Sequence, residues 1–119
     1  MTLREMAERL GLALLTPEIA ERADRDARLG HVSDLLSDVL ANAPAGSVLV
    51  TIQTHLNVIA VAVNAEVAAV VFAWDRRPDE PARRKAAEEG ILLYGSPASA
   101  FEIVGRLHAL GVRGGSRDA

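Results

Sequence analysis

The sequence predicts an α/β fold: a small three-layer domain whose mainly parallel sheet of about four strands is covered by helices. Two observations support this class. Residues 48–50 and 67–73 are apolar throughout, which is typical of strands buried on both faces. The segments between such runs carry apolar residues at helical spacing, and parallel strands need crossovers of this kind. Half of the 119 residues are apolar, which is enough for one domain with its own core.

The N-terminus predicts a helix and then a short strand. Thr2 and Glu5 have the spacing of a capping box, and apolar residues recur at helical spacing as far as Leu10. Gly11 is suited to end this helix. The four apolar residues 12–15 that follow predict a short buried strand.

The next stretch predicts a short helix, a loop and a second helix. Residues 16–23 begin with Thr-Pro, which can cap and open a short helix. Residues 24–30 are expected to form a polar loop. Ser33 is a good N-cap for a helix that runs to about residue 43, where Pro-Ala-Gly at 44–46 stops it.

The centre of the chain predicts a strand, a helix and another strand. Residues 47–53 and 67–73 are the strands. Residues 56–65 are ambiguous, because their valines favour a strand while their alanines and length favour a helix. We interpret them as a fully buried helix with Thr54 as N-cap, since two parallel strands need a crossover between them.

The last third predicts two helices with a strand between them. Asp79 caps a charged helix that Gly90 closes, and residues 91–94 form the last strand. A final helix runs from about Ser99 to Leu110. No repeat or linker divides the chain, so residues 1–112 are expected to be one domain and residues 113–119 a disordered tail.

The charge of the chain disfavours a nucleic-acid or membrane-surface partner. The net charge is −3 and the pI is near 5.6, whereas both partners usually require a basic face. Basic residues do cluster within 76–85, but carboxylates surround them. We interpret this segment as a solvated helix face with pairs such as Glu80–Arg84.

The absence of cysteine excludes disulfides, thiol catalysis and zinc–thiolate sites, and it fits a cytoplasmic location. The apolar run at 58–63 is far too short to span a bilayer. Residues 1–10 carry charges at helical spacing and do not have the pattern of a signal peptide.

A polar segment at residues 51–57 separates two apolar runs and is the natural candidate for a site. Polar groups in such a place must find partners or bind something. The expected ligand-binding residues are Asp34, Gln53, Thr54, His55 and Asn57. Thr54 and Asn57 fit equally well as cap residues, whereas for Gln53 and His55 binding and structural roles are evenly balanced.

The predicted topology places this segment at the carboxyl ends of the strands, where ligands gather in open α/β sheets. Thr16, Trp74-Asp75 and Gly95-Ser96 are expected at the same edge. An anion could bind the free N–H groups of the helix that follows Thr54. Trp74 is either a partner contact or a ring that half-covers the core.

Catalytic and metal-binding patterns are weak. Asp34, Ser37 and His55 could suggest a hydrolase triad, but no nucleophile-elbow pattern surrounds a serine. His31, Asp34 and His55 match no standard zinc spacing, and no glycine-rich phosphate loop joins a strand to a helix. The sequence therefore predicts no enzyme, no metal and no cofactor.

Three segments carry a family resemblance. Residues 24–37 (DRDARLGHVSDLLS), residues 51–62 (TIQTHLNVIAVA), and Pro78-Asp79-Glu80 with residues 87–91 (AEEGI) resemble the DRTGG domain family. Within the first segment, Arg28, Leu29 and His31 depart from the family pattern of Thr, Gly and an aromatic residue. The family resembles the N-terminal domain of HPr kinase/phosphorylase, and it occurs as a module of CBS-domain pyrophosphatases.

The resemblance implies a non-catalytic regulatory or ligand-sensing α/β module, often at a dimer interface. From it and from the apolar composition we expect a homodimer. The alternative is a small-molecule binding domain for a nucleotide-like or other anionic metabolite. The two hypotheses, a regulatory module and a small-molecule binding domain, can be distinguished by whether the purified protein retains a ligand.

Overall fold

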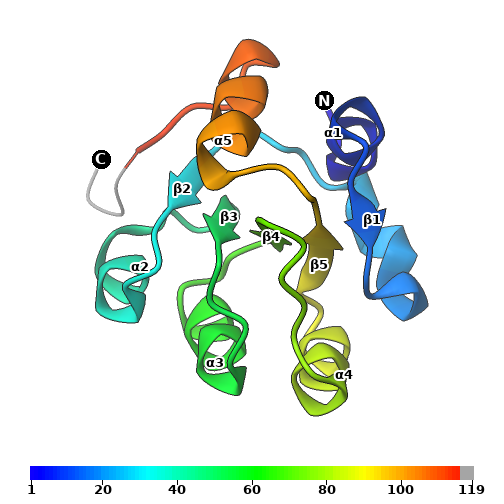
Figure 1. The fold of residues 1–119 in the computed structure, drawn as a ribbon, viewed down its shortest axis with the longest axis vertical. Helices are drawn as coiled ribbons and strands as arrows, with labels where there is room; N and C mark the ends of the chain where they lie inside the picture. Colours follow the sequence, from blue (N-terminus) through cyan, green and yellow to red (C-terminus); the bar gives the residue numbers. More distant parts are fainter. Residues whose placement is uncertain (116–119) are drawn as a thin grey trace.

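The computed structural model describes residues 1–115 and folds them into a five-stranded sheet with helices on both faces (Figure 1). The predicted three-layer α/β class is confirmed. The elements in chain order are α1 (Leu3–Leu10), β1 (Ala13–Leu14), the 3₁₀ helix η1 (Pro17–Asp24), β2 (Gly30–Val32), α2 (Leu36–Asn42), β3 (Val48–Thr51), α3 (Leu56–Asn64), β4 (Ala69–Phe72), α4 (Glu80–Glu88), β5 (Leu92–Gly95) and α5 (Ala100–Ala109).

The strand order is β1-β5-β4-β3-β2, and β2 to β5 run parallel to one another. Alternate residues of β3, β4 and β5 enter two separate cores. Val48 and Val50 face α1 and α5, whereas Leu49 faces α2, α3 and α4. All four residues of β3, β4 and β5 are buried for this reason, which explains their unbroken apolar runs.

The predicted first strand forms, but β1 pairs with β5 in the antiparallel direction. Its end therefore points away from the carboxyl ends of the parallel strands. The fully buried Thr16 lies beside the middle of β5, where its Oγ1 accepts a hydrogen bond from the Leu93 N–H at 3.1 Å. The prediction that Thr16 shares an edge with the candidate site is wrong, because a short antiparallel strand needs no crossover.

Strand β2 was not predicted, because Gly30 and His31 lack the apolar pattern of a buried strand. Gly30 pairs with Val48 along β3, and its own N–H donates to the Arg113 carbonyl at 2.9 Å. Arg113 thus lies against the outer side of β2, next to Leu29. Arg113 was predicted to belong to a disordered tail, but it is hydrogen-bonded to β2. Residues 116–119 of that predicted tail lie outside the part of the chain that the structure describes.

Three helix starts differ from the prediction. Thr16 does not cap η1 with its side chain, because its Oγ1 accepts the Leu93 N–H instead. Helix α2 begins three residues after Ser33, whose Oγ accepts a hydrogen bond from the Leu35 N–H at 3.1 Å within a turn. Helix α3 confirms the helical interpretation of 56–65, but its N-cap is His55 rather than Thr54. The imidazole Nδ1 accepts the Asn57 N–H at 3.1 Å, a role that serine or threonine usually has.

The other helix ends follow the prediction. Thr2 and Glu5 form a capping box, and Asp79 and Ser99 accept N–H groups at the starts of α4 and α5. The pair Glu80–Arg84 closes at 3.7 Å on the charged face of α4. Within residues 1–115, no helix is long and apolar enough to cross a membrane.

Candidate functional site

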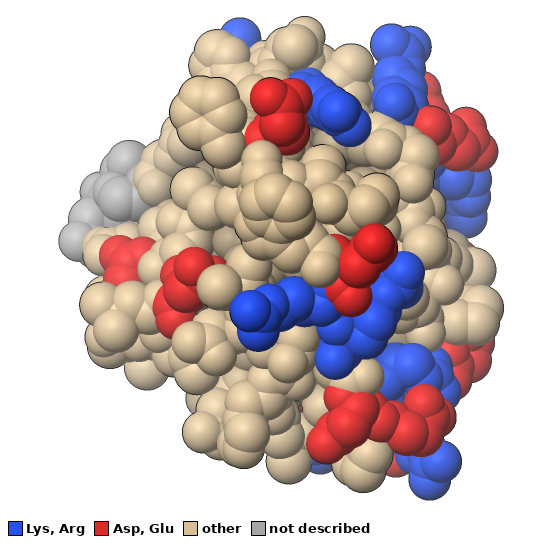
Figure 2. Space-filling view, viewed as in Figure 1, with Lys and Arg blue, Asp and Glu red and all other residues tan. Residues whose placement is uncertain are grey.

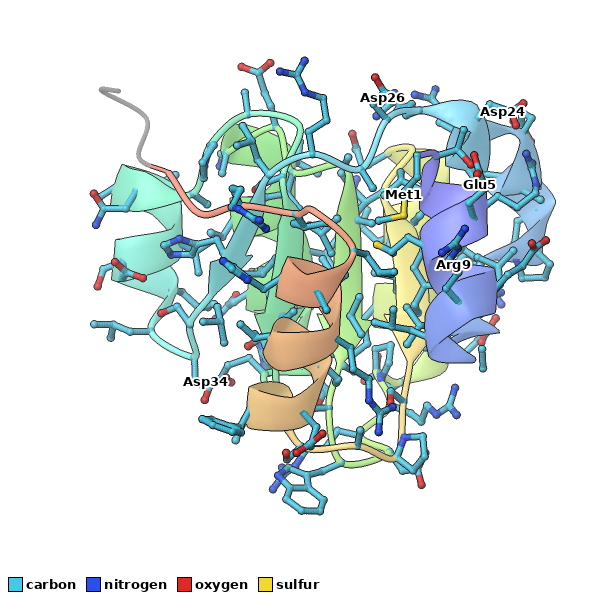
Figure 3. The ribbon with its side chains drawn as sticks, turned by 90° about the horizontal axis from the view of Figure 1, so that it is seen from above. Met1, Glu5, Arg9, Asp24, Asp26 and Asp34 are labelled. Atoms are coloured by element: carbon cyan, nitrogen blue, oxygen red, sulfur yellow. The ribbon has the colours of Figure 1, made fainter. Side chains whose placement is uncertain are left out.

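The carboxyl ends of the four parallel strands meet at one edge of the sheet, which we call the carboxyl edge. It consists of residues 33–35 after β2, 52–55 after β3, 73–79 after β4 and 96–99 after β5. The loops of this edge face the viewer in Figure 1, and Figure 2 shows the same face with uncharged surface between scattered basic and acidic side chains, which are most numerous toward the lower right. In Figure 3, Asp34 lies at this edge, far from Met1 and Asp26 beside α1.

Asp34 is the centre of a hydrogen-bond network that joins β2 to β3. Its Oδ1 accepts the Thr51 hydroxyl at 2.9 Å and the Ile52 N–H at 2.8 Å. The Gln53 side-chain amide donates to the Asp34 carbonyl at 3.1 Å, and Thr51 Oγ1 accepts the Gln53 N–H at 3.1 Å. The structure thus brings together the predicted residues Asp34 and Gln53 and adds the buried Thr51, which sequence reasoning did not assign to the site.

The other three predicted residues lie at the start of α3. His55 is exposed and uses Nδ1 as the cap, so in its neutral form the proton is on Nε2, which faces away from the cap bond. Asn57 contributes its backbone N–H to that cap, and its side chain is exposed. The side chains of Thr54 and Asn57 make no hydrogen bond with residues 1–115, so their polar groups are available to a ligand.

Asp34 and His55 do not bond to each other in the described chain. The hydrogen bonds of Asp34 go to β3. His31 contacts Asp38 instead, with Nε2 2.8 Å from Oδ2. Hydrogen bonds from Asn42, His31 and Ser33 lower the pKa of Asp38 to about 2. Among residues 1–115, no group of three His, Asp or Glu side chains is placed to hold a metal ion.

The loop after β4 is held by backbone hydrogen bonds, unlike the side-chain network around Asp34. Trp74 and Asp75 both have a left-handed backbone, with φ of 59° and 55°. Their N–H groups donate to the carbonyls of Ala98 at 2.9 Å and Ser96 at 2.8 Å. Two adjacent non-glycine residues in this conformation are uncommon and are strained unless their surroundings hold them. The result presents the Trp74 ring, 63% exposed, at the edge.

Basic side chains accompany this ring. Arg76 and Arg77 are both exposed and follow directly in the chain. The Arg77 guanidinium lies against Gly95, where a Cβ atom would come within 2.7 Å of Nη1. It also lies 3.9 Å from the Asp75 carboxylate. The combination of an exposed ring with two guanidinium groups suits a ligand that has both a planar group and an anionic group.

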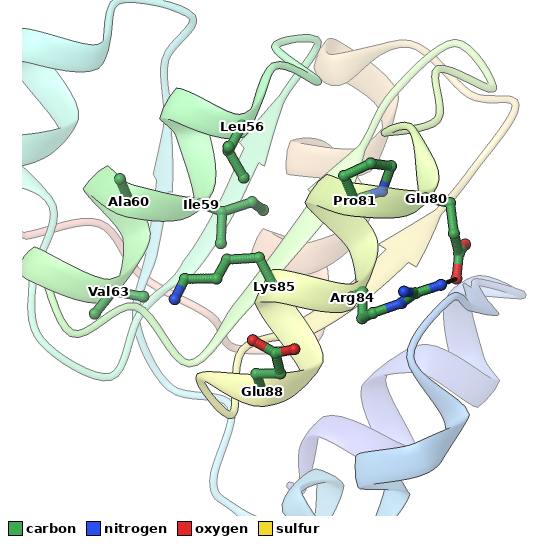
Figure 4. Close-up of a pocket in the computed structure, with 9 residues that line it drawn as sticks. All are labelled: Leu56, Ile59, Ala60, Val63, Glu80, Pro81, Arg84, Lys85 and Glu88. Atoms are coloured by element: carbon green, nitrogen blue, oxygen red, sulfur yellow. Dashed lines mark ion pairs between the residues drawn. The ribbon is translucent and has the colours of Figure 1, made fainter.

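A concave surface lies elsewhere, between α3 and α4 on the outer side of the domain (Figure 4). This groove encloses about 710 Å³ and is lined by Leu56, Ile59, Ala60, Val63, Glu80, Pro81, Arg84, Lys85 and Glu88. Leu56 and Ile59 point across it toward α4, and Lys85 extends toward α3.

The groove corrects the expectation that α3 is fully buried, because Leu56 is 47% exposed. The signal was present in the sequence: Leu56, Ala60 and Val63 recur at intervals of four and three, in addition to the stripe that enters the core.

Comparisons with known proteins support the fold. No protein-family model matches the chain, and no curated protein matches it. Among solved structures, the CBS and DRTGG domains of the regulatory region of Clostridium perfringens pyrophosphatase, complexed with the activator diadenosine tetraphosphate, match with a TM-score of 0.66. The match covers 89% of this chain and 45% of that chain, with 11% sequence identity. This likeness supports a DRTGG-like fold, and the chain spans less than half of its neighbour.

Proposed function

We propose that residues 1–112 form a DRTGG-like module with a regulatory or ligand-sensing role, without catalysis of its own, that self-associates. The observation that supports this most directly is the fold shared with a regulatory region of a pyrophosphatase over most of the chain. Because fold alone does not determine function, the residues of the carboxyl edge have to be consistent with this role.

They are consistent with a non-catalytic role. The carboxylate and the imidazole best placed for acid–base chemistry, Asp34 and His55, have separate structural functions at the edge. General acid–base catalysis needs such groups within hydrogen-bond reach of a common reacting atom. A screen of purified protein against nucleoside triphosphates, phosphoesters and acyl esters should give no turnover. Turnover that His55→Ala abolishes would overturn this part of the proposal.

The carboxyl edge also supports the second candidate, a binding domain for a nucleotide-like or other anionic metabolite. Its site would include Asp34, Gln53, Thr54, His55 and Asn57. Asp34 and Gln53 would shape the edge, and the side chains of Thr54 and Asn57, together with Nε2 of His55, would contact the ligand. The exposed Trp74 ring would stack on a base, and Arg76 would neutralise a phosphate. The structural neighbour was itself crystallised with a dinucleotide activator.

Isothermal titration calorimetry with ATP and with diadenosine tetraphosphate tests this candidate. His55→Asn is the sharpest variant, because asparagine retains an N-cap acceptor but lacks the ring. We expect this variant to lose affinity about tenfold or more without a change in melting temperature. His108→Asn, an exposed histidine on α5, is the matched control. Equal affinity of both variants and the wild type would exclude His55 from the site.

Self-association is proposed from the exposed large apolar side chains. These are Val32, Leu35, Leu40, Leu56, Trp74 and Phe101. Contiguous apolar surface on a small domain is commonly covered by a symmetric partner. Light scattering should give twice the mass of one chain at tens of micromolar, and the mass of one chain at that concentration would contradict self-association.

A further inference from the structure

A small hollow lies between α1, η1 and β5, away from the carboxyl edge, and encloses about 200 Å³. In Figure 1, α1, η1 and β1 lie together at the right-hand end of the sheet. The walls of the hollow are mostly aliphatic, and the residues from α1 and η1 are alanines, whose side chains are too short to fill the space. The apolar residues are Ala7, Leu12, Leu14, Ala20 and Ala23.

Tyr94 of β5 lines the hollow and carries a polar group without a partner. The residue is only 2% exposed, yet its hydroxyl makes no hydrogen bond with residues 1–115. Tyr94 pairs with Leu14 across the sheet, so both side chains lie on the face that α1 covers. Burial raises the pKa of Tyr94, so the hydroxyl keeps its proton at neutral pH and can donate. A buried hydroxyl without a partner is uncommon in native proteins and calls for an explanation.

Arg4 stands at the rim of the hollow and is held in place by η1. Its guanidinium bonds to the Asp24 carboxylate and donates from Nη2 to the Ala20 carbonyl at 3.0 Å. In Figure 3, Asp24 lies beside α1. The guanidinium is also close enough to Tyr94 for an electrostatic interaction between the two groups. Its bonds to η1 leave other N–H donors for a ligand, because arginine has more donors than these bonds use.

Glu8 supplies the opposite charge at the same rim. Its carboxylate is exposed and makes no hydrogen bond or ion pair with residues 1–115. Residues four apart on a helix are neighbours, so Arg4 and Glu8 flank one opening. A ligand with an anionic and a cationic group side by side matches this pair, and an apolar body matches the walls. Pockets for drug-sized ligands enclose about 300–1,000 Å³, so this hollow suits a smaller molecule.

We propose that this hollow binds a free α-amino acid with a small aliphatic side chain. Tyr94 and Arg4 donate to the ligand carboxylate, and Glu8 accepts from the ligand ammonium group. The aliphatic side chain packs against Leu12 and Leu14. This inference goes beyond the proposed function, because the hollow shares no residue with the carboxyl edge and either site can bind a ligand without the other.

Titrations of the full chain followed by amide NMR spectra test the ligand class. L-leucine should shift the backbone amides of Ala7 and Ala23 and bind with a dissociation constant below about 1 mM. Isoamylamine lacks the carboxylate and should bind at least about tenfold more weakly, and isocaproate lacks the ammonium group and should bind at least about threefold more weakly. No shift with L-leucine or L-valine at tens of millimolar, or equal affinity for leucine and its two analogues, would overturn the proposal.

Tyr94→Phe tests the hydroxyl alone, because phenylalanine retains the ring. The melting temperature should be unchanged, since the hydroxyl that is removed has no partner in the described chain. The affinity for L-leucine should fall about tenfold, as for a lost hydrogen bond to a charged group. An unchanged affinity would overturn the assignment of this hydroxyl to a ligand.

Glu8→Gln tests the recognition of the ammonium group. It should weaken L-leucine about threefold or more and leave isocaproate no weaker, since isocaproate has no ammonium group. Glu21→Gln is the matched control, because Glu21 is an exposed carboxylate of η1 outside the hollow, and it should change neither affinity. A Glu8→Gln variant that binds both compounds as the wild type does would overturn the recognition of an amino acid by this rim.

Discussion

The two halves of the carboxyl edge are held in different ways. In the half formed by β2 and β3, side chains hold the loops: Asp34 bonds to Thr51 and Ile52. In the half formed by β4 and β5, the main chain holds the loops, through the bonds from the N–H groups of Trp74 and Asp75. The first arrangement commits polar side chains to structure. The second leaves the exposed side chains of Trp74 and Arg76 for a ligand or a partner, whereas Arg77 pairs with Asp75.

The two constructions also differ in their response to pH. A carboxylate accepts hydrogen bonds best when it is ionised, whereas backbone amides do not titrate in the accessible range. Hydrogen bonds lower the pKa of Asp38, which contacts His31 of β2, so acid should weaken this contact beside β2. The following predictions test the contrast, beginning with the largest effect.

Asp34→Ala should cost about 2 kcal/mol of unfolding free energy, because it leaves the Ile52 N–H and the Thr51 hydroxyl without their acceptor. Urea denaturation monitored by circular dichroism measures the change. Asp34→Asn is the control, since its amide oxygen can still accept both bonds, and it should lose less than half as much. Equal stability of the wild type and Asp34→Ala would show that the β2–β3 half does not depend on this carboxylate.

Acid should remove the contribution of Asp38. The pKa of Asp38 is lowered from 3.8 to about 2 by hydrogen bonds from Asn42 and His31. A lowered pKa means that the folded state favours the ionised form, so the stabilisation is complete above about pH 4 and is lost as the pH falls toward 2. The stability difference between the wild type and Asp38→Asn should shrink across this window. A difference that stays constant from pH 5 to pH 2 would contradict the assignment.

Trp74→Gly should change stability by less than about 1 kcal/mol, because glycine relieves the left-handed backbone while most of the ring is already in water. Its effect should appear in binding instead, as weaker affinity for ATP in calorimetry. The melting temperatures of Trp74→Gly and Asp34→Ala, measured side by side, compare the β4–β5 half of the carboxyl edge with the β2–β3 half. A loss as large as that of Asp34→Ala would mean that Trp74 supports the fold and is not free for a ligand.

The sequence was informative where local chemistry decides the structure. The capping box at Thr2 and the caps at Asp79 and Ser99 follow from short-range rules, and the structure confirms them. The buried strands β3 and β4 follow from unbroken apolar runs. Helix α3 required a topological argument, because its valines alone do not distinguish a helix from a strand.

The failures arose where distant segments decide the structure. Gly30 belongs to a strand because Val48 lies on one side of it and Arg113 on the other, and neither is a neighbour in the chain. Thr16 lies at the other edge because β1 runs antiparallel. Asp34 and the segment that begins at Thr51 were both noted from the sequence, but the hydrogen bond between them is visible only in the structure, because the two residues are distant in the chain.

The bond between Gly30 and Arg113 has a consequence for the order in which the fold is completed. The segment β3-α3-β4-α4-β5 joins neighbours in the chain, whereas the outer side of β2 is covered by a residue close to the end of the described chain. Loop closure delays such distant contacts. During synthesis on the ribosome, this side of β2 stays open until residue 113 has emerged. We expect nascent chains halted before this point to be the forms most prone to pair edge to edge with one another.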